Sequence, residues 1–389
     1  MIVVDLLFEL LRYALKQQPL SEQTLNGIPQ EDLKKLYSLS KRHDIAHLVA
    51  YALTSNNLLE KPSEAYDAFI HQERLSIFRY ENINHQLHIV SDLFEKNGVE
   101  HILLKGSVIR AYYPEPWMRT SCDIDILVHE KDVDRAVQLL QEQLSVTVES
   151  KSVYDVSVYA SGNVHLEIHF NLSVDGQKKQ TVDLLSTVWE HTSLEDGRAY
   201  TRKMSDEMYY FYHLAHMSKH FGGNGCGIRS FLDLWVLENI PCDKEKRLEF
   251  AKKGGLDKFM IAGIKTAKVW MDEQPHEQIT LSIQDYILHS GVYGSEQTRT
   301  ISAQNKKGGK FRYAMSRIFL NTKELATQYP VLLKHKWLMP ICHIRRWFRL
   351  VFCGGVKRSV GELKYIANLP QDRIKSTEKM MNELGLWDK

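Results

Sequence analysis

The fold is decided by the stretch Ser121-Cys122-Asp123-Ile124-Asp125-Ile126-Leu127-Val128. Its apolar second half indicates a β-strand, in which successive side chains point to opposite faces. Asp123 and Asp125 therefore share one face, and the two isoleucines share the other. Carboxylates this close repel each other unless a cation or solvent lies between them, and magnesium is usually held by carboxylates together with substrate phosphates. A solvated strand edge without a ligand is the alternative, because an Asp-x-Asp pattern is common.

Two neighbouring motifs favour a phosphate site. Upstream, Lys105-Gly106-Ser107 follows a short apolar run and precedes a helical pattern. Glycine lets the backbone approach a phosphate, and the following amides and the Ser107 hydroxyl can donate hydrogen bonds to its oxygens. Downstream, the strand-like alternation from His165 to Phe170 places Glu167 between His165 and His169 on one polar face. A third carboxylate on a neighbouring strand is what a two-metal phosphoryl-transfer site requires. The two histidines either orient a carboxylate or join a metal shell; half-exposed, inert side chains are the interpretation that we favour.

A second polar cluster lies on a later helical pattern. His213, His216 and His220 share one helical face, but no HExxH arrangement accompanies them, so the sequence gives little support to zinc. We expect this face to line the nucleotide or acceptor side of a cleft, through His216, Lys219 and His220 with Arg229 and Asp233. Polar residues that only cap and bridge two helices are the alternative.

The remaining pattern predicts an α+β fold, with a small mixed β-sheet and helices on one side of it. Helical spacing occupies Val4–Leu15 and Glu31–Leu53, and a long helix is expected from Ser63 to Asn97-Gly98. Helical periodicity returns from Met204, and the polar stretch Ser295–Lys310 is expected to be a linker or mobile loop.

Composition narrows the class of protein. The chain has 389 residues, which is enough for two or three domains, and its net charge of +2 is too small to imply a nucleic-acid or membrane partner globally. Five cysteines without a CxxC pair indicate neither a zinc knuckle nor a disulfide framework. The start lacks the features of a signal peptide, and no run of about 18 apolar residues suggests a membrane span. We therefore expect a cytoplasmic protein.

The chain resembles the bacterial uncharacterised nucleotidyltransferase family, within the DNA polymerase β-type superfamily, over about residues 87 to 300. The motifs that carry the resemblance are Leu104-Lys105-Gly106, Tyr113-Pro114, Arg119, Asp123 to Val128, Glu167-Ile168-His169 and Gly227 to Trp235. We expect four regions: an N-terminal helical region (1–86), a nucleotidyltransferase core (87–200), a helical domain closing the cleft (201–300) and a basic helical C-terminal region (301–389).

The resemblance also implies a chemistry, which is transfer of a nucleoside monophosphate from an NTP to an acceptor with release of pyrophosphate. Gly106 and Ser107 would hold the triphosphate, and Asp123, Asp125 and Glu167 would bind Mg²⁺ or Mn²⁺. Lys105 and Arg119 flank the motif and are candidates for phosphate contact, with ordinary surface charge as the alternative. The segment between Ser107 and Asp123 is longer than in many superfamily members, so it is expected to reshape the nucleotide pocket.

Two function hypotheses follow. The first is a magnesium-dependent enzyme whose acceptor is a small molecule, a sugar or a protein hydroxyl. The second is a non-catalytic nucleotide-binding or antitoxin-like regulatory protein that retains the fold. A nucleic-acid polymerase or tRNA-modifying enzyme comes third, because no pronounced basic domain surrounds the motif.

The C-terminal region is locally basic and aromatic. Its members are Lys334, Lys336, Arg345, Arg346, Arg349, Lys357, Arg358 and Lys364, interleaved with Trp337, Trp347, Phe348 and Phe352. This pattern fits an interfacial helix on anionic lipid, a surface for nucleic acid or a phosphorylated acceptor, or a solvated basic face packed on the body. The aromatic positions do not follow one clean stripe, which argues against the lipid interpretation.

Overall fold

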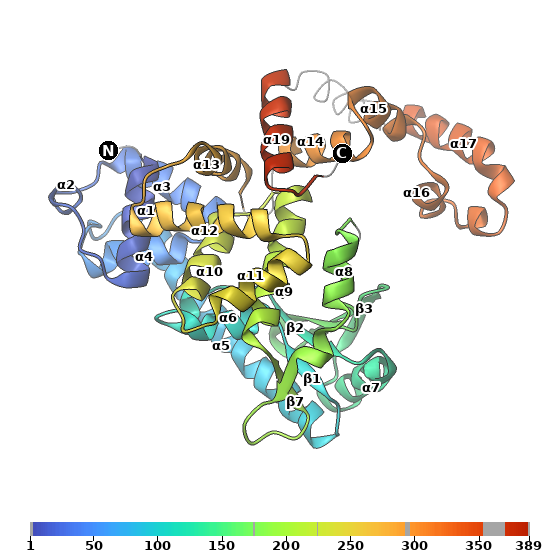
Figure 1. Ribbon diagram of the computed structural model, residues 1–389, viewed down its shortest axis with the longest axis horizontal. Coiled ribbons are helices and arrows are strands. Elements are labelled where there is room, and N and C mark those ends of the chain that lie inside the picture. The colour runs from blue at the N-terminus through green and yellow to red at the C-terminus, as the bar shows by residue number, and fades with distance from the viewer. Residues whose placement is uncertain (1–2, 174–175, 224, 292–295, 353–369, 388–389) are drawn as a thin grey trace.

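The strands form one seven-stranded mixed sheet with the order β3-β4-β5-β2-β1-β7-β6, in the lower part of Figure 1. The structure is a computed structural model that describes residues 3–173, 176–223, 225–291, 296–352 and 370–387. β2 pairs in parallel with β5, and β1 with β7, whereas the other neighbours are antiparallel. The strands are β1 (His101–Leu103), β2 (Asp123–Val128), β3 (Thr147–Lys151), β4 (Asp155–Ala160), β5 (Val164–His169), β6 (Thr192–Leu194) and β7 (Thr201–Met204).

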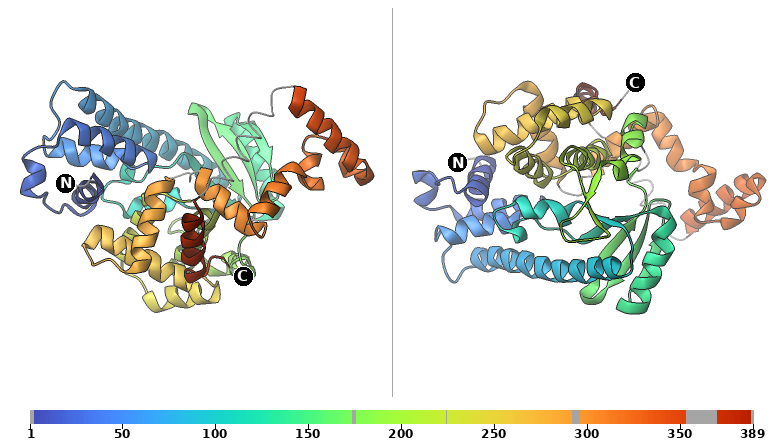
Figure 2. Two further views of the ribbon diagram at one scale, coloured as in Figure 1. Left: turned by 90° about the horizontal axis from the view of Figure 1, so that it is seen from above. Right: turned by 60° about the horizontal axis from the view of Figure 1, so that its bottom comes forward.

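One face of the sheet is covered by two helices, α5 (Glu64–Lys96) and α7 (Val133–Leu144) (Figure 2). The isoleucines of β2, Ile124 and Ile126, pack in a buried cluster with Ile168 of β5 and with apolar residues of both helices. Leu127 points to the opposite face, the one that carries the two aspartates, and joins a different cluster. The expected α+β architecture, a mixed sheet with helical flanks, is confirmed.

Helices from both ends of the described chain build the second and larger core. It joins the N-terminal helices to the helices that follow the sheet, so regions far apart in sequence share one apolar interior. The N-terminal helices are α1 (Val3–Lys16), α2 (Glu22–Leu25), α3 (Gln30–Arg42) and α4 (Ala46–Ser55). The later ones are α8 (Lys179–Leu185), α9 (Asp206–Gly223), α10 (Ile228–Glu238), α11 (Lys244–Lys253), α12 (Asp257–Asp272), α13 (Gln278–Ser290) and α19 (Gln371–Glu383). Helix α14 (Glu296–Lys306) packs beside α9 and α19.

The long helix α5 follows its sequence signals closely. The Ser63 side chain accepts a hydrogen bond from the Tyr66 amide at the N-terminus, and Asn97 caps the C-terminus before Gly98, whose φ is +66°. Its 33 residues run unbroken across the expected domain boundary at residues 86 and 87. The proposed division into four regions remains a prediction.

Two local expectations need correction, and two strands were not expected. The pattern Glu31–Leu53 forms two helices instead of one, because the chain turns between α3 and α4, where Asp44 has a φ of +55°. The polar stretch Ser295–Lys310 mostly forms α14, because Ile301 and Ser302 are buried and Ser302 donates a hydrogen bond to the Gly222 carbonyl. Strands β6 and β7 are too short and polar to be recognised by alternation.

Residues 310–352, hereafter the C-terminal unit, project away from the body (Figure 1). The unit contains α15 (Lys310–Ile318), α16 (Thr322–Ala326), two short turns at Pro330–Leu333 and Lys336–Leu338, and α17 (Met339–Phe352). Lys357, Arg358 and Lys364 lie outside the described residues. None of the described helices has the length and apolarity needed to cross a membrane.

Candidate active site

The register of β2 against β5 brings the predicted acidic residues together. Asp125 lies opposite Glu167, and Asp123 lies opposite His165. The strand pairing therefore produces two overlapping groups of potential ligands, Asp123–His165–Glu167 and Asp125–Glu167–His169. Within each group the ligand atoms lie within 4.8 Å of one another. Carboxylate oxygens with imidazole nitrogens suit a divalent cation such as Mn²⁺, and the carboxylates alone suit Mg²⁺.

Asp125 is the most enclosed member of the site. Its carboxylate accepts hydrogen bonds from the Lys105 ammonium at 2.7 Å and from His169 Nε2 at 2.8 Å, and its side chain is 2% exposed. His169 Nε2 also lies 3.2 Å from Glu167 Oε2, and Lys105 Nζ lies 3.9 Å from the same oxygen. Lys105 and His169 thus join carboxylates of both strands, so the interpretation of His169 as an inert side chain is wrong.

The electrostatics of the two aspartates differ. Burial raises the pKa of Asp123, and the nearby negative charge of Asp125 raises it further. Burial alone would also raise the pKa of Asp125, but the charge of Lys105 and the hydrogen bond from His169 outweigh it, so that pKa falls below its usual range. The negative charge of Asp125 is therefore balanced by Lys105. A cation beside Asp123 would relieve the repulsion between the two aspartates.

The turn after β1 holds Lys105 in an unusual backbone conformation. Its φ of 42° and ψ of −121° are disfavoured for a residue with a side chain, and Tyr209 donates a hydrogen bond to its carbonyl. Gly106 follows, and a Cβ there would lie 2.9 Å from the Cβ of Ser121, so only glycine fits. Ser107 does not line the cavity described below, and its buried hydroxyl has no hydrogen-bond partner among the described residues. Its expected phosphate contact stays a prediction.

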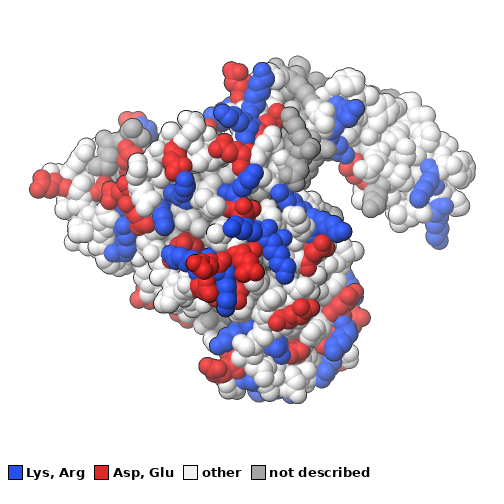
Figure 3. Space-filling view, in the orientation of Figure 1, with Lys and Arg blue, Asp and Glu red and all other residues white. Residues whose placement is uncertain are grey.

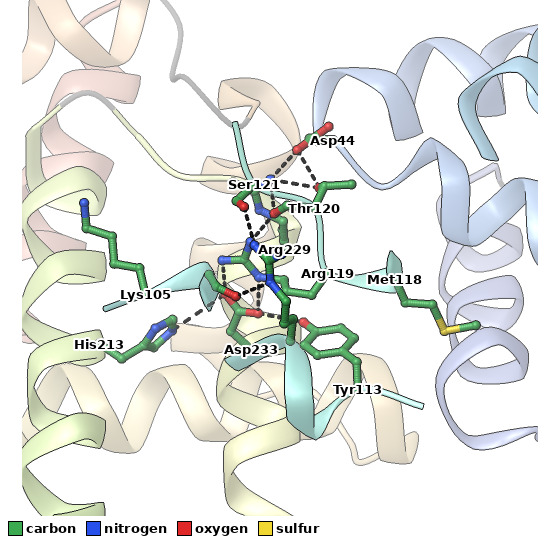
Figure 4. A network of polar contacts seen from close by, with 12 residues as sticks. Asp44, Lys105, Tyr113, Met118, Arg119, Thr120, Ser121, His213, Arg229 and Asp233 are labelled. Carbon is green, nitrogen blue, oxygen red and sulfur yellow. Dashed lines mark hydrogen bonds and ion pairs between the residues drawn. The ribbon is translucent and has the colours of Figure 1, made fainter. Parts of the chain in front are cut away.

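Arg119 is engaged in a buried ion pair (Figure 4). Its guanidinium donates two hydrogen bonds to Asp233 of α10, from Nε at 2.7 Å and from Nη2 at 2.8 Å. Tyr113 donates a third hydrogen bond to the same carboxylate, and the Asp233 side chain is 2% exposed. The phosphate contact expected of Arg119 therefore has a competing partner, and its clear role is to join the segment before β2 to α10.

The segment between Ser107 and Asp123 also contacts the N-terminal helices. Asp44, at the turn between α3 and α4, accepts hydrogen bonds from Thr120 and from Arg229 (Figure 4). His47 donates a hydrogen bond from Nε2 to the Met118 carbonyl. Sequence reasoning missed Asp44 and His47, because only the folded chain brings positions so distant to this segment.

A cavity of about 500 Å³ opens over the acidic pair. Its wall is built from β2, β5, α9 and α10, and it contains most of the residues that the sequence had singled out. Among the lining residues are Lys105, Gly106, Arg119, Asp123, Asp125, Glu167, His169, His213, His216, Lys219, His220, Arg229 and Asp233. The expectation that the polar face of α9 and the start of α10 line the same cleft is confirmed. Sequence reasoning missed Asn171, Gln177 and Tyr212, which line it too.

The histidines of α9 are neutral wall residues. The Nε2 atoms of His216 and His220 lie 3.2 Å apart. Burial lowers the pKa of His216 well below its usual value, and burial lowers that of His220 to about 4. His213 lies 3.9 Å from Asp233. Within the described residues, these histidines do not belong to either group of ligands that could hold a metal.

Comparison with known proteins identifies the family of the chain. The model of a family described as uncharacterised nucleotidyltransferase matches residues 29–272, which is more than half of the chain and includes the sheet, the acidic pair and the cavity wall. Neither the curated proteins nor the solved structures contain a match. The chain belongs to the uncharacterised nucleotidyltransferase family.

Proposed function

We propose that the protein is a divalent-metal-dependent nucleotidyltransferase that transfers a nucleoside monophosphate from an NTP to an acceptor hydroxyl. The observation that carries the proposal is the convergence of Asp123, Asp125 and Glu167 on neighbouring strands in the wall of the cavity. Family membership supports nucleotidyl transfer in general. The acceptor is a small molecule, a sugar or a protein hydroxyl.

The proposed reaction forms one bond and breaks one. The acceptor oxygen bonds to the α-phosphorus, the bond from that phosphorus to the bridging oxygen breaks, and pyrophosphate leaves. The acceptor proton passes to a carboxylate of the site. Because phosphoryl transfer needs little covalent chemistry from the protein, positioning and charge stabilisation provide most of the rate enhancement.

The described residues divide this task between them. Asp123, Asp125 and Glu167 would hold Mg²⁺ or Mn²⁺, which when bound offsets phosphate charge. The Lys105 ammonium lies 2.7 Å from Asp125 and 3.9 Å from Glu167, and it would exchange Asp125 for a phosphate oxygen when a nucleotide binds. Gly106 lines the cavity, and its lack of a side chain lets the turn after β1 lie close to Ser121.

The opposite wall of the cavity would face the nucleoside or the acceptor. His216 and His220 are neutral at physiological pH because burial lowers their pKa values. Neutral imidazoles can donate or accept hydrogen bonds with a base, a ribose or an acceptor hydroxyl. Lys219 lies beside them in the lining.

The test measures nucleotide binding and turnover separately. Each of the four NTPs, labelled at the α-phosphate, is incubated with the protein and Mg²⁺ or Mn²⁺, and bound label, transferred label and pyrophosphate are measured. We expect metal-dependent binding of at least one NTP, lost in Asp123→Asn/Asp125→Asn. The control is Asp134→Asn, since the Asp134 side chain is 91% exposed on α7 and pairs only with Lys151 among the ion pairs found.

The outcomes separate the hypotheses. Binding that does not depend on metal, or that survives the double substitution unchanged, contradicts the proposal. Metal-dependent binding without pyrophosphate release for any acceptor class favours the non-catalytic nucleotide-binding or antitoxin-like alternative. Label on the protein itself identifies a protein hydroxyl as an acceptor.

A further inference from the structure

Helix α17 has an inner face that is already used within the C-terminal unit. Cys342 and His343 are buried, and the cluster around Cys342 includes Leu325 and Leu332. His343 Nε2 donates a hydrogen bond to the Leu320 carbonyl at 3.1 Å. The small core of the unit therefore lies on this side of the helix.

The outer face of α17 is apolar and exposed. It presents Ile341, Ile344 and Phe348, with exposed fractions of 57%, 50% and 60%. Trp337, which is 73% exposed, lies in the short turn Lys336–Leu338 directly before the helix. We call these four residues the apolar stripe. The spacing of three and four residues places Ile341, Ile344 and Phe348 on one side of α17. Trp347, which obscures this pattern in the sequence, turns inward and donates a hydrogen bond to the Ile318 carbonyl. The irregular aromatic pattern, which argued against a lipid-binding helix, therefore arises from the inward-facing Trp347 and not from the exposed Trp337 and Phe348.

Positive charge borders the apolar stripe. Arg345 and Arg349 each follow a stripe residue by one position, and both are exposed. They line an open hollow of about 640 Å³ together with Tyr329 and Phe348. Arg349 also donates a hydrogen bond to Gln328. Residues 325–361 contain no aspartate or glutamate, and the visible surface of the C-terminal unit is mostly white with scattered blue (Figure 3).

We propose that the apolar stripe docks onto the surface of an anionic lipid bilayer. An apolar helical face bordered by arginines is suited to lie between acyl chains and phosphate headgroups. Charge complementarity selects the lipid, because an acid-free basic segment is attracted to the negative surface of such a membrane. At 14 residues α17 is about 21 Å long, so the contact is parallel to the membrane plane. The C-terminal unit projects from the body (Figure 1), which leaves this face accessible.

The test uses the full-length protein and vesicles of defined composition. Flotation is compared on vesicles of phosphatidylcholine alone and on vesicles that also contain phosphatidylglycerol, at low and high salt. We expect binding to the anionic vesicles only, weakened by salt because the arginine contribution is screened. Ile341→Ser/Ile344→Ser should weaken binding by about tenfold or more, since the two half-exposed isoleucines together favour binding by at least about that factor when they are buried in an apolar phase. Arg345→Glu/Arg349→Glu should abolish the preference for anionic vesicles.

A matched control removes two exposed apolar residues elsewhere. Ile261 and Leu281 are 45% and 46% exposed on α12 and α13, and Ile261→Ser/Leu281→Ser should bind like the unmodified protein. Circular dichroism checks that every variant is folded. Absence of binding to anionic vesicles, or binding that Ile341→Ser/Ile344→Ser leaves unchanged, overturns the proposal. So does a dimer in light scattering that dissociates on that substitution, because the stripe would then be covered by a second copy of the chain. The result does not depend on nucleotidyl transfer, which is assayed without vesicles.

Discussion

Replacement of Asp233 by alanine should destabilise the protein more than any surface charge change. The carboxylate of Asp233 accepts two hydrogen bonds from Arg119 and one from Tyr113, and its side chain is 2% exposed. Burial alone would raise its pKa, but the Arg119 charge outweighs this and keeps that pKa low. Asp233→Ala leaves the Arg119 guanidinium buried without its counter-ion, which typically costs about 3–5 kcal/mol.

The magnitude translates into a measurable shift. At about 2.1 cal/mol/K per residue, unfolding of 389 residues has an entropy of roughly 0.8 kcal/mol/K. The loss of about 3–5 kcal/mol then lowers Tm by about 4–6 °C. Differential scanning calorimetry measures this shift, and urea unfolding gives the change in free energy independently.

The control and the rescue decide whether the reasoning holds. Asp134→Ala breaks an exposed ion pair with Lys151 and should change the free energy of unfolding by less than about 1 kcal/mol. Arg119→Met/Asp233→Leu removes both charges and should recover most of the loss, because no charge is then buried alone. If Asp233→Ala behaves like Asp134→Ala, or if the double variant loses as much as the single one, the buried pair does not join the two segments as described.

Two further changes test other contacts. Gly106→Ala should lower the free energy of unfolding by about 1–3 kcal/mol, because the new Cβ would lie 2.9 Å from the Ser121 Cβ. The control is Gly223→Ala, where a Cβ meets nothing within 4 Å and no loss of stability is expected. Chemical denaturation measures the free energy of unfolding of both variants. Burial lowers the pKa of His47 to about 4 from 6.5, so below pH 6.5 the unfolded state binds a proton that the folded state rejects. Stability should therefore fall as pH drops from 6.5 to 4, by roughly 3 kcal/mol from this residue. His47→Gln, whose amide can still donate to the Met118 carbonyl, should make the pH profile less steep over that interval, where buried histidines such as His220 still contribute. Equal slopes would show that His47 does not titrate as described.

The sequence predicted those parts of the site that depend on local spacing. Alternation places Asp123 and Asp125 on one face whatever the rest of the chain does, and the capping residues of α5 are adjacent to the helix they end. The role of His169 could not be predicted, because its partner Asp125 lies 44 residues away and is brought close only by strand register. For the same reason Arg119 looked like a phosphate ligand, since its partner Asp233 is 114 residues distant.

Amphipathic patterns were harder to interpret in α14, which buries only a few positions, and in α17, where aromatic residues lie on both the inner and the outer face. The α14 segment is polar, yet it is a helix, because a few buried positions such as Ile301 are enough to hold it against α9. On α17, periodicity alone does not show which aromatic residues pack inward. The exposed fractions of Trp337 and Phe348 separate them from Trp347.

The unbroken α5 affects how the protein can be divided. Its Phe69 belongs to the core of the N-terminal and later helices, whereas Ile83, Leu87 and Phe94 belong to the core beneath the sheet. One helix of about 50 Å thus contributes side chains to both cores. Disruption of either interior exposes part of the same helix, so the two should lose structure together in one cooperative transition. A fragment cut near residue 86 would begin or end inside α5. Any shortened version of the protein should therefore keep the whole of this helix.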